Sequence, residues 1–256
     1  MRQLIAFTKK ELMEQLRTGK LLLFAIVFCL FGVMNPAIAK LTPWMMELMS
    51  EQLAESGMIV SAMEVNDLTS WMQFFKNMPM ALIVFLVLFS GILTSEYQKG
   101  TLINVVTKGM KRWRIFISKM GVMMVVWTLG CLISYGITFA YNAFFWDNST
   151  AYHVFSAVIC FYLLGLWLIS VLGMASVFVN SSGAVILLVG IAYVISYLLG
   201  MFPAVKEYLP VSLMDSAAML AGTKDIGDYA AAVVVTVVLI VLQIIISVAA
   251  FNKKNL

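Results

Sequence analysis

The sequence predicts an all-α membrane protein with six transmembrane helices, and three observations lead to this prediction. The chain is 62% apolar and only 12% charged, and its mean hydropathy of +0.96 lies well above that of soluble domains. Six apolar stretches approach or exceed the roughly 20 helical residues that a hydrocarbon core requires. Lys and Arg gather beside these stretches instead of being spread along the chain.

The six predicted spans form a single domain over residues 1–256, and no span carries an ionisable side chain at its middle. They cover residues 21–39, 78–94, 115–140, 154–179, 184–201 and 229–251. The Asn35-Pro36 pair is expected to loosen the outer end of the first span. Pumps driven by protons or ions usually need buried ionisable groups. Energy for any uphill transport is therefore expected from outside the spans.

The distribution of cations predicts the orientation. With both termini on one side, that side carries 13 of the 17 Lys and Arg residues: Arg2, Lys9, Lys10, Arg17, Lys20, Lys99, Lys108, Lys111, Arg112, Arg114, Lys119, Lys253 and Lys254. By the positive-inside rule, both termini are cytoplasmic. Because these cations lie beside apolar spans, we expect membrane lipid head groups as their acidic partner and no nucleic acid.

The first twenty residues predict an amphipathic interfacial helix. Leu4, Ile5, Leu12 and Leu16 are spaced so that most of them fall on one helical face. The basic residues around them suit a helix that lies on an anionic leaflet.

The first outer excursion, residues 41–77, is rich in Met and aromatic residues, and two short helices are expected in it. One covers residues 43–55 and ends near Gly57, and the other starts at a cap formed by Asn66 or Asp67. Two interpretations stay open: helices lying in the interface, or an adaptable lining for apolar substrates.

The second outer excursion, residues 203–228, predicts a re-entrant or interfacial helix before the sixth span. Pro210 precedes this helix, Ser212 is its expected N-cap, and Gly222 is its expected terminator.

Residues 95–119 form a long polar segment bounded on both sides by apolar runs. Gly100 is expected to end the preceding helix, and Thr101 to cap a short helix over residues 102–106. Leu102, Val105 and Val106 then form a small apolar face ringed by cations. Two interpretations stay open: a docking element for a partner, or a helix resting on the membrane surface.

Two small or polar stripes mark candidate seams between spans. Ser134 and Thr138 continue a spacing of four residues from Gly130, and Thr236 and Gln243 share one side of the sixth span. Tight packing is the favoured interpretation of both stripes, and a translocation path is the alternative.

No constellation for catalysis or metal binding is predicted. The phosphate-binding pattern GxxxxGK[ST] is absent from the sequence, so the chain is not expected to hydrolyse ATP itself. His153 stands alone without other metal ligands at suitable spacing. Cys29, Cys131 and Cys160 lie in apolar runs and are interpreted as small buried hydrophobes.

Several motifs together resemble the ABC-2 family of ATP-binding-cassette membrane subunits. The sequence EYQKGTLINVVTKGMKRWRIFISK begins at Glu96, and it is similar to the family's pattern of a Glu, a Gly-Thr pair, a short coupling helix and a basic entry to the next span. FTKKELMEQLRTGK, from Phe7, resembles the family's amphipathic N-terminal helix. The Asn-Pro of the first span, the SWMQFFKN before the second and the Pro-rich segment before the sixth extend the resemblance over nearly the whole chain.

The resemblance implies a permease subunit of an ATP-driven exporter in a bacterial plasma membrane. Two such subunits, identical or different, would form the translocation path, and two copies of a separate ATPase subunit would bind ATP and Mg²⁺ beneath them. The implied coupling residues are Glu96, Gly100, Thr101, Leu102, Val105, Val106, Lys111 and Arg112. Glu96 is expected either to pair with Arg17 or Lys20 or to stay solvated.

The cargo implied by the resemblance and by the uncharged spans is an amphipathic or antimicrobial peptide, or another hydrophobic compound. A passive channel or an immunity-type membrane protein acting without ATP is the alternative function.

Overall fold

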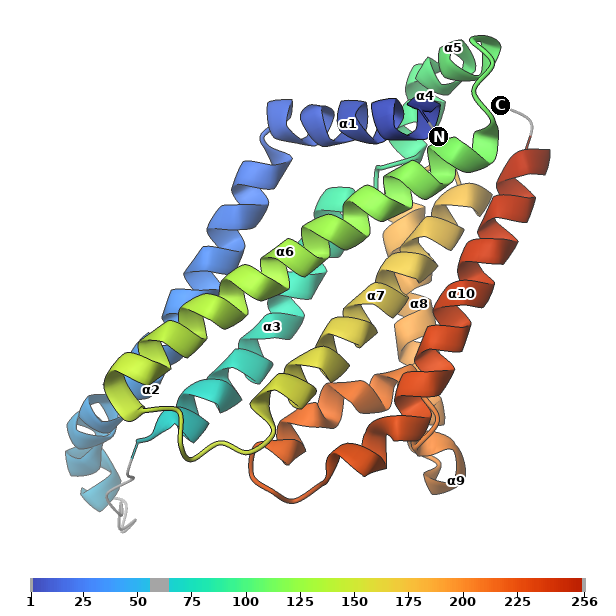
Figure 1. Ribbon diagram of the computed structural model, residues 1–256. Coiled ribbons are helices and arrows are strands. Elements are labelled where there is room, and N and C mark those ends of the chain that lie inside the picture. Colours follow the sequence, from blue (N-terminus) through green and yellow to red (C-terminus); the bar gives the residue numbers. More distant parts are fainter. Residues whose placement is uncertain (1, 56–64, 255–256) are drawn as a thin grey trace.

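The computed structural model describes residues 2–55 and 65–254, and this part of the chain is helical without strands (Figure 1). The elements are α1 (Arg2–Arg17), α2 (Lys20–Glu55), α3 (Asp67–Phe89), α4 (Thr94–Lys99), α5 (Thr101–Thr107), α6 (Arg112–Trp146), α7 (Val154–Phe178), α8 (Ser182–Leu199), α9 (Pro203–Lys206), the 3-10 segments η1 (Pro210–Met219) and η2 (Ile226–Tyr229), and α10 (Ala230–Lys253). Helices α2, α3, α6, α7, α8 and α10 provide six segments long and apolar enough to cross a membrane. The predicted number of spans is confirmed.

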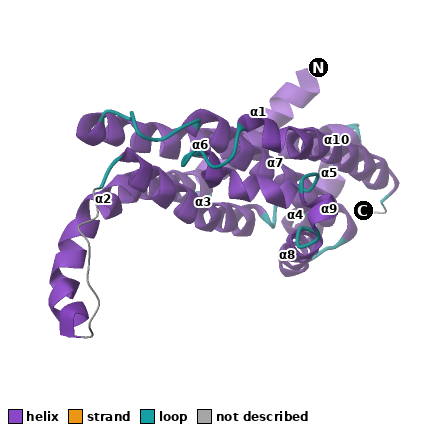
Figure 2. Cartoon of the chain, turned by 90° about the horizontal axis from the view of Figure 1, so that it is seen from below, coloured by secondary structure: helices purple, strands orange, loops and turns teal. Residues whose placement is uncertain are grey.

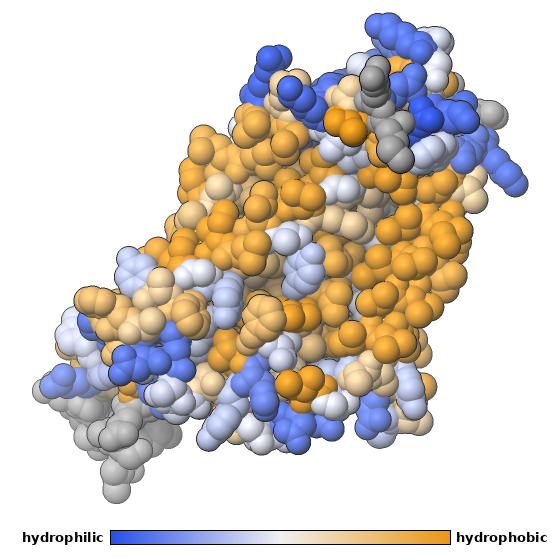
Figure 3. Space-filling view, viewed as in Figure 1, coloured by the Kyte–Doolittle hydropathy of each residue, from blue (hydrophilic) through white to orange (hydrophobic). Residues whose placement is uncertain are grey.

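The molecule has two polar ends separated by an apolar band. Both termini, α1, α4 and α5 lie together at one end, which we call the charged end, and α9 lies at the opposite, far end (Figure 1). The surface between the ends is mostly hydrophobic on the face shown in Figure 3. Figure 2 shows the helices from the far end, where the outer part of α2 leaves the bundle. This distribution matches the slab of hydrocarbon in a bilayer.

An aromatic core holds the middle of the bundle together. Trp127 on α6 is fully buried, and its ring lies 5.8 Å from that of Phe28, 5.5 Å from Phe85 and 6.4 Å from Phe161. Gly165 on α7 permits this close approach, because a Cβ at this glycine would lie 2.3 Å from the Trp127 ring. The indole also donates a hydrogen bond to the Tyr162 carbonyl oxygen at 3.2 Å. Helices α2, α3, α6 and α7 thus meet at one tryptophan.

Helix α2 continues through Pro36, so the predicted loosening at Asn35-Pro36 is wrong. Proline lacks an N–H and leaves the carbonyl four residues earlier without its helical donor. Here that carbonyl belongs to Gly32, and the Thr138 hydroxyl on α6 donates to it at 3.1 Å. The neighbouring helix therefore replaces the lost backbone bond.

The two helices predicted in the first outer excursion are extensions of spans. The segment starting at Pro43 is the outer part of α2, whose 36 residues reach about 54 Å at 1.5 Å per residue. The expected terminator Gly57 lies outside the described residues. Asn66 is the N-cap of α3, as predicted, and accepts a hydrogen bond from the Thr69 N–H at 3.2 Å. Helix α3 then runs without a break into the second span.

The helix expected before the sixth span is present as the 3-10 helix η1. Residues three apart in a 3-10 helix lie on one face, and here Pro210, Leu213, Ser216 and Met219 are all buried. Ser212 is not the N-cap, because its hydroxyl donates backward to the Leu209 carbonyl oxygen at 2.7 Å. Gly222 has the left-handed φ of +66° expected of a terminator.

Helix α6 also differs from its predicted span. It continues through Trp146, so the first half of the loop expected after residue 140 is helical. Cys131 and Cys160 are buried as expected, whereas Cys29 is exposed on the apolar band.

Candidate functional site at the charged end

The α4–α5 hairpin is formed by two glycines in the left-handed region. Gly100, with φ of +65°, ends α4, and its N–H donates to the Tyr97 carbonyl oxygen at 3.2 Å. Gly109, with φ of +83°, follows α5. The short helix α5 is present as predicted, but Gly100 holds its N-cap position and Thr101 is its first residue. A residue with a Cβ is strained at these φ values.

The apolar face of α5 is already partly used within the chain. Leu102 is 1% exposed, and Val105 and Val106 are partly buried against the same core. Ile103, the next residue along the helix, is 48% exposed. The apolar face that the sequence predicted thus packs against the chain itself: Leu102 anchors the hairpin, and Ile103 is a large apolar side chain that stays exposed.

The exposed side of the hairpin is basic. Its exposed residues include Lys99, Ile103, Asn104, Lys108 and Lys111. Arg112 points elsewhere, because its guanidinium donates to the carbonyl oxygens of Asn252 and Lys254 and ties the start of α6 to the end of α10.

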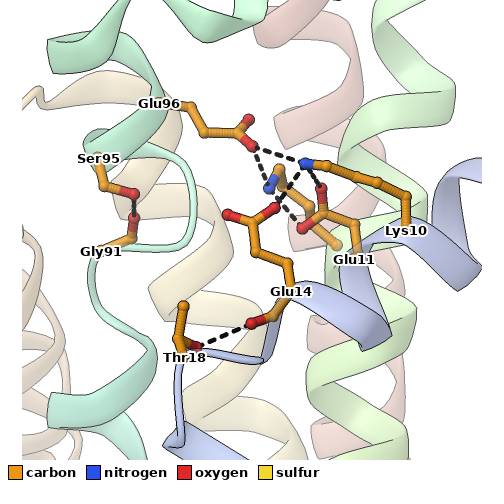
Figure 4. A network of polar contacts seen from close by, with 8 residues as sticks. Lys10, Glu11, Glu14, Thr18, Gly91, Ser95 and Glu96 are labelled. Atoms are coloured by element: carbon orange, nitrogen blue, oxygen red, sulfur yellow. Dashed lines mark hydrogen bonds and ion pairs between the residues drawn. The ribbon is translucent and has the colours of Figure 1, made fainter. Parts of the chain in front are cut away.

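A buried ion cluster joins this hairpin to α1 and α6 (Figure 4). The Lys119 Nζ on α6 lies 2.7 Å from Glu11 Oε2 on α1 and 3.0 Å from Glu96 Oε1 on α4. The Lys10 Nζ lies 2.9 Å from Glu11 Oε1, 2.6 Å from Glu14 Oε2 and 3.5 Å from Glu96 Oε1. Three acids and two lysines from three helices thus form one network.

The burial of this cluster shows why its members need one another. Glu11 is 1% exposed and Lys119 2% exposed, and an unpaired charge at such sites costs several kcal/mol. The predicted partners of Glu96, Arg17 and Lys20, are wrong: its carboxylate pairs with Lys10 and Lys119. The carboxylate is also buried and not solvated. Sequence reasoning missed Glu11 and Lys119. The available signal was Lys119 itself, because a cation inside a predicted span needs a partner.

Glu11, Glu14 and Glu96 have carboxylate oxygens within 4.8 Å of one another, which is close enough for a shared cation. The ammonium groups of Lys10 and Lys119 lie among these oxygens and supply the positive charge. We therefore interpret the cluster as an ion-pair network that fastens α1 to the bundle.

The partly exposed pair of Lys10 and Glu14 predicts that the stability of the chain is weakly sensitive to acid. The hydrogen bond from Lys10 lowers the pKa of Glu14. Burial by itself lowers the pKa of Lys10, but the bonds to Glu14 and Glu11 and the charge of Glu96 outweigh it and raise this pKa. The contribution of Glu14 to the free energy of unfolding is present above the free carboxyl pKa of about 4.3. It is lost as the pH falls through the lowered pKa. The Lys10 contribution is lost only as the pH rises above its raised pKa.

We expect acidification from pH 7 to pH 3 to cost the native chain about 0.5 kcal/mol more than the Glu14→Gln variant, the value of one exposed i,i+4 pair. The free energy of unfolding in mixed micelles at both pH values checks this. An equal loss in both proteins would contradict it.

The hairpin also contacts the turn between α7 and α8 and the end of α10. The hydroxyls of Thr94 and Ser182 share a hydrogen bond of 3.0 Å, and Gln98 Nε2 donates to the Asn180 carbonyl oxygen at 3.0 Å. Lys254 donates to Asn180 Oδ1 at 2.8 Å and lies 4.0 Å above the Tyr97 ring. Burial lowers the pKa of Lys254. A displacement of α4 and α5 therefore acts on α1, α6, the α7–α8 turn and α10 together.

The candidate seam residues lie between helices. Ser134 and Thr138 are fully buried in the contact of α6 with α2, where Asn35 Nδ2 donates to Thr138 Oγ1 at 3.2 Å. Thr236 on α10 is fully buried as well. Gln243 accepts a hydrogen bond from the Ser170 hydroxyl on α7. The structure thus places these four residues in contacts between helices.

These features define a helical multi-pass membrane protein whose loops and termini meet in a polar assembly at one end of six apolar helices. The chain belongs to the family described as Protein of unknown function (DUF2705), whose model matches residues 45–256. The match covers α3 through α10 and the outer part of α2. The chain is also similar to the uncharacterized transmembrane protein YxlG of Bacillus subtilis (strain 168), with 21% identity over 227 residues, 85% of this chain and 84% of the relative.

Proposed function

We propose that the chain is the membrane permease subunit of an ATP-driven exporter in a bacterial plasma membrane. In this proposal the charged end faces the cytoplasm, and a separate ATPase subunit, which binds ATP and Mg²⁺, docks on the α4–α5 hairpin. The chain pairs with a second permease subunit to form the translocation path, and two ATPase copies serve the pair.

The observation that carries the proposal is that the hairpin is exposed on one side and linked to several helices on the other. Its exposed side offers Ile103 among the lysines Lys99, Lys108 and Lys111, a surface suited to an acidic cleft with an apolar floor. Its buried side is linked to α1 and α6 through Glu96 and to the α7–α8 turn through Thr94. A partner that pulls on this one segment moves most of the bundle.

The ion cluster supplies the stiffness that such a mechanism needs. Lys119 is paired with acids from both α1 and α4. If either helix moved away from α6, a buried charge would lose its partner, which is costly. The hairpin, α1 and the start of α6 are expected to move as one body.

We expect Ile103→Asp to abolish association with the ATPase subunit, because a carboxylate then meets the acidic cleft of the partner. The tagged chain is purified from its own bacterium, and ATP hydrolysis of the purified complex is measured. Retention of the ATPase chain should fall at least tenfold. Leu102→Asp is unsuitable for this purpose, because its buried side chain would destabilise the hairpin itself.

Ile226→Asp is the matched control, since Ile226 is 50% exposed at the far end. Both variants should be obtained in equal amounts and unfold like the native chain. Copurification of the ATPase chain with Ile103→Asp at the native level, or purification of the native chain without any nucleotide-hydrolysing subunit, would contradict the proposal.

A further inference from the structure

An apolar cavity of about 350 Å³ lies between α3, α7 and α8, within the membrane-spanning part of the bundle. Its walls include Leu82 and Leu86 of α3, Leu164 and Leu168 of α7, and Val189 of α8. No charged or amide side chain lines it. The hydroxyl of Tyr193, at the end of the cavity nearest η1, donates to the Met214 Sδ at 2.9 Å. The volume lies near the lower limit of small-molecule sites.

One wall of this cavity is held loosely. Helix α8 buries only Val185, Val189 and Ser196 of its 18 residues against the rest of the described chain. A wall with so few buried residues is displaced at low cost. An apolar molecule dissolved in the bilayer therefore has a route between α3 and α8 into the cavity.

A second cavity of about 580 Å³ adjoins the first at the far end. Met214 lines both cavities, and Tyr193 and Tyr197, one helical turn apart on α8, line the first and the second respectively. The second cavity carries Lys206 and Asp215, whose Nζ and Oδ2 atoms lie 3.5 Å apart with about half of each side chain exposed. An exposed pair of this kind contributes little and separates easily.

The two cavities together match the two parts of an amphiphile. The first cavity disfavours an extended peptide, because backbone amides placed in it would lose water without gaining hydrogen-bond partners. It accepts an alkyl chain, which needs none. The second cavity offers one positive and one negative side chain, so a head group with both charges meets both.

We propose that this chain binds a single-chain zwitterionic amphiphile, with the alkyl chain in the α3–α7–α8 cavity and the head group between Lys206 and Asp215. As the cargo of the exporter, this amphiphile deepens the proposed function and rests on it. Binding itself needs no ATPase subunit. Tyr193 and Met214 then form a constriction between the two cavities, through which the alkyl chain of the amphiphile passes.

The first test fills the apolar cavity. The full chain in maltoside micelles is irradiated with a lysophosphocholine that carries a diazirine on its acyl chain, and the labelled peptides are identified by mass spectrometry. Gly190 lines the cavity with no atom within 4 Å of an added Cβ, and Ile83 lines it from α3. Gly190→Phe and Ile83→Trp should each lower labelling of α3, α7 and α8 at least tenfold.

Gly136→Phe is the matched control, because Gly136 on α6 has equally free surroundings outside the cavity. It should label like the native chain. Labelling spread over the outer surfaces of all six spans, or labelling unchanged by both cavity-filling variants, would show ordinary contact with detergent or lipid and would overturn the proposal.

The second test addresses the head group. Lys206→Ala and Asp215→Ala should each raise the Kd of the zwitterionic probe about fivefold and leave unchanged that of an alkyl glucoside with the same chain. Equal effects on both probes, or none on either, would overturn the head-group assignment. Both tests use the chain without nucleotide, so a missing ATPase partner contradicts only the exporter, and missing amphiphile binding contradicts only this inference.

Discussion

Replacement of Lys119 by methionine is expected to destabilise the chain by about 3 kcal/mol, at the lower limit for breaking a buried ion pair. The ammonium group lies 2.7 Å from Glu11 and 3.0 Å from Glu96, and both carboxylates are buried. Lys10 remains 2.9 Å from Glu11 and compensates in part. The free energy of unfolding, measured with dodecyl sulfate in mixed micelles, checks this.

The double variant Lys119→Met, Glu11→Leu should recover most of that loss, because it removes the buried acid together with its cation. Lys108→Met is the matched control on the same segment, since Lys108 is exposed, and it should stay within about 0.5 kcal/mol of the native chain. A double variant as unstable as Lys119→Met would show that the pairing with Glu11 is not what stabilises α1.

Replacement of Trp127 by alanine is expected to cost about 2–4 kcal/mol, slightly less than the 3–5 kcal/mol typical of soluble cores. The side chain is fully buried among Phe28, Phe85 and Phe161, so its loss leaves a cavity that removes packing contacts. The hydrophobic transfer term is small, because the unfolded helices remain in lipid or detergent. Unfolding in mixed micelles gives the value.

Phe144→Ala provides the control for Trp127→Ala, because Phe144 also lies on α6 but is 82% exposed. Its removal should change the free energy of unfolding by less than about 0.5 kcal/mol. A loss as large as that of Trp127→Ala would show that the cost comes from helix α6 in general and not from the aromatic core.

The six spans were predictable because a bilayer imposes a length and a polarity on each helix separately. The start of α3 at the Asn66 cap and the left-handed turns at Gly100 and Gly222 were equally local. The continuity of α2 through Pro36 was not, because it depends on the Thr138 hydroxyl more than one hundred residues away. A sequence read locally shows the lost donor without its replacement.

The same limit applies to the candidate site. The sequence predicted a short helix after Gly100, but which side of α5 is buried depends on the core beneath Leu102. The partners of Glu96 are Lys10 on α1 and Lys119 on α6. Helix periodicity alone does not distinguish these two cations from Arg17 and Lys20. Contacts between distant helices decide both questions.

The proposed docking of a cytoplasmic ATPase is tested most directly by determining on which side of the membrane the α4–α5 hairpin lies. In a chain whose three native cysteines are replaced by alanine, Lys108→Cys and Thr223→Cys place single thiols at exposed positions of the charged end and the far end. Intact cells are treated with a membrane-impermeant maleimide. We expect labelling at residue 223 only, with residue 108 labelled once the cells are opened. Labelling of residue 108 in intact cells would contradict it, because no cytoplasmic ATPase can dock on an outer surface.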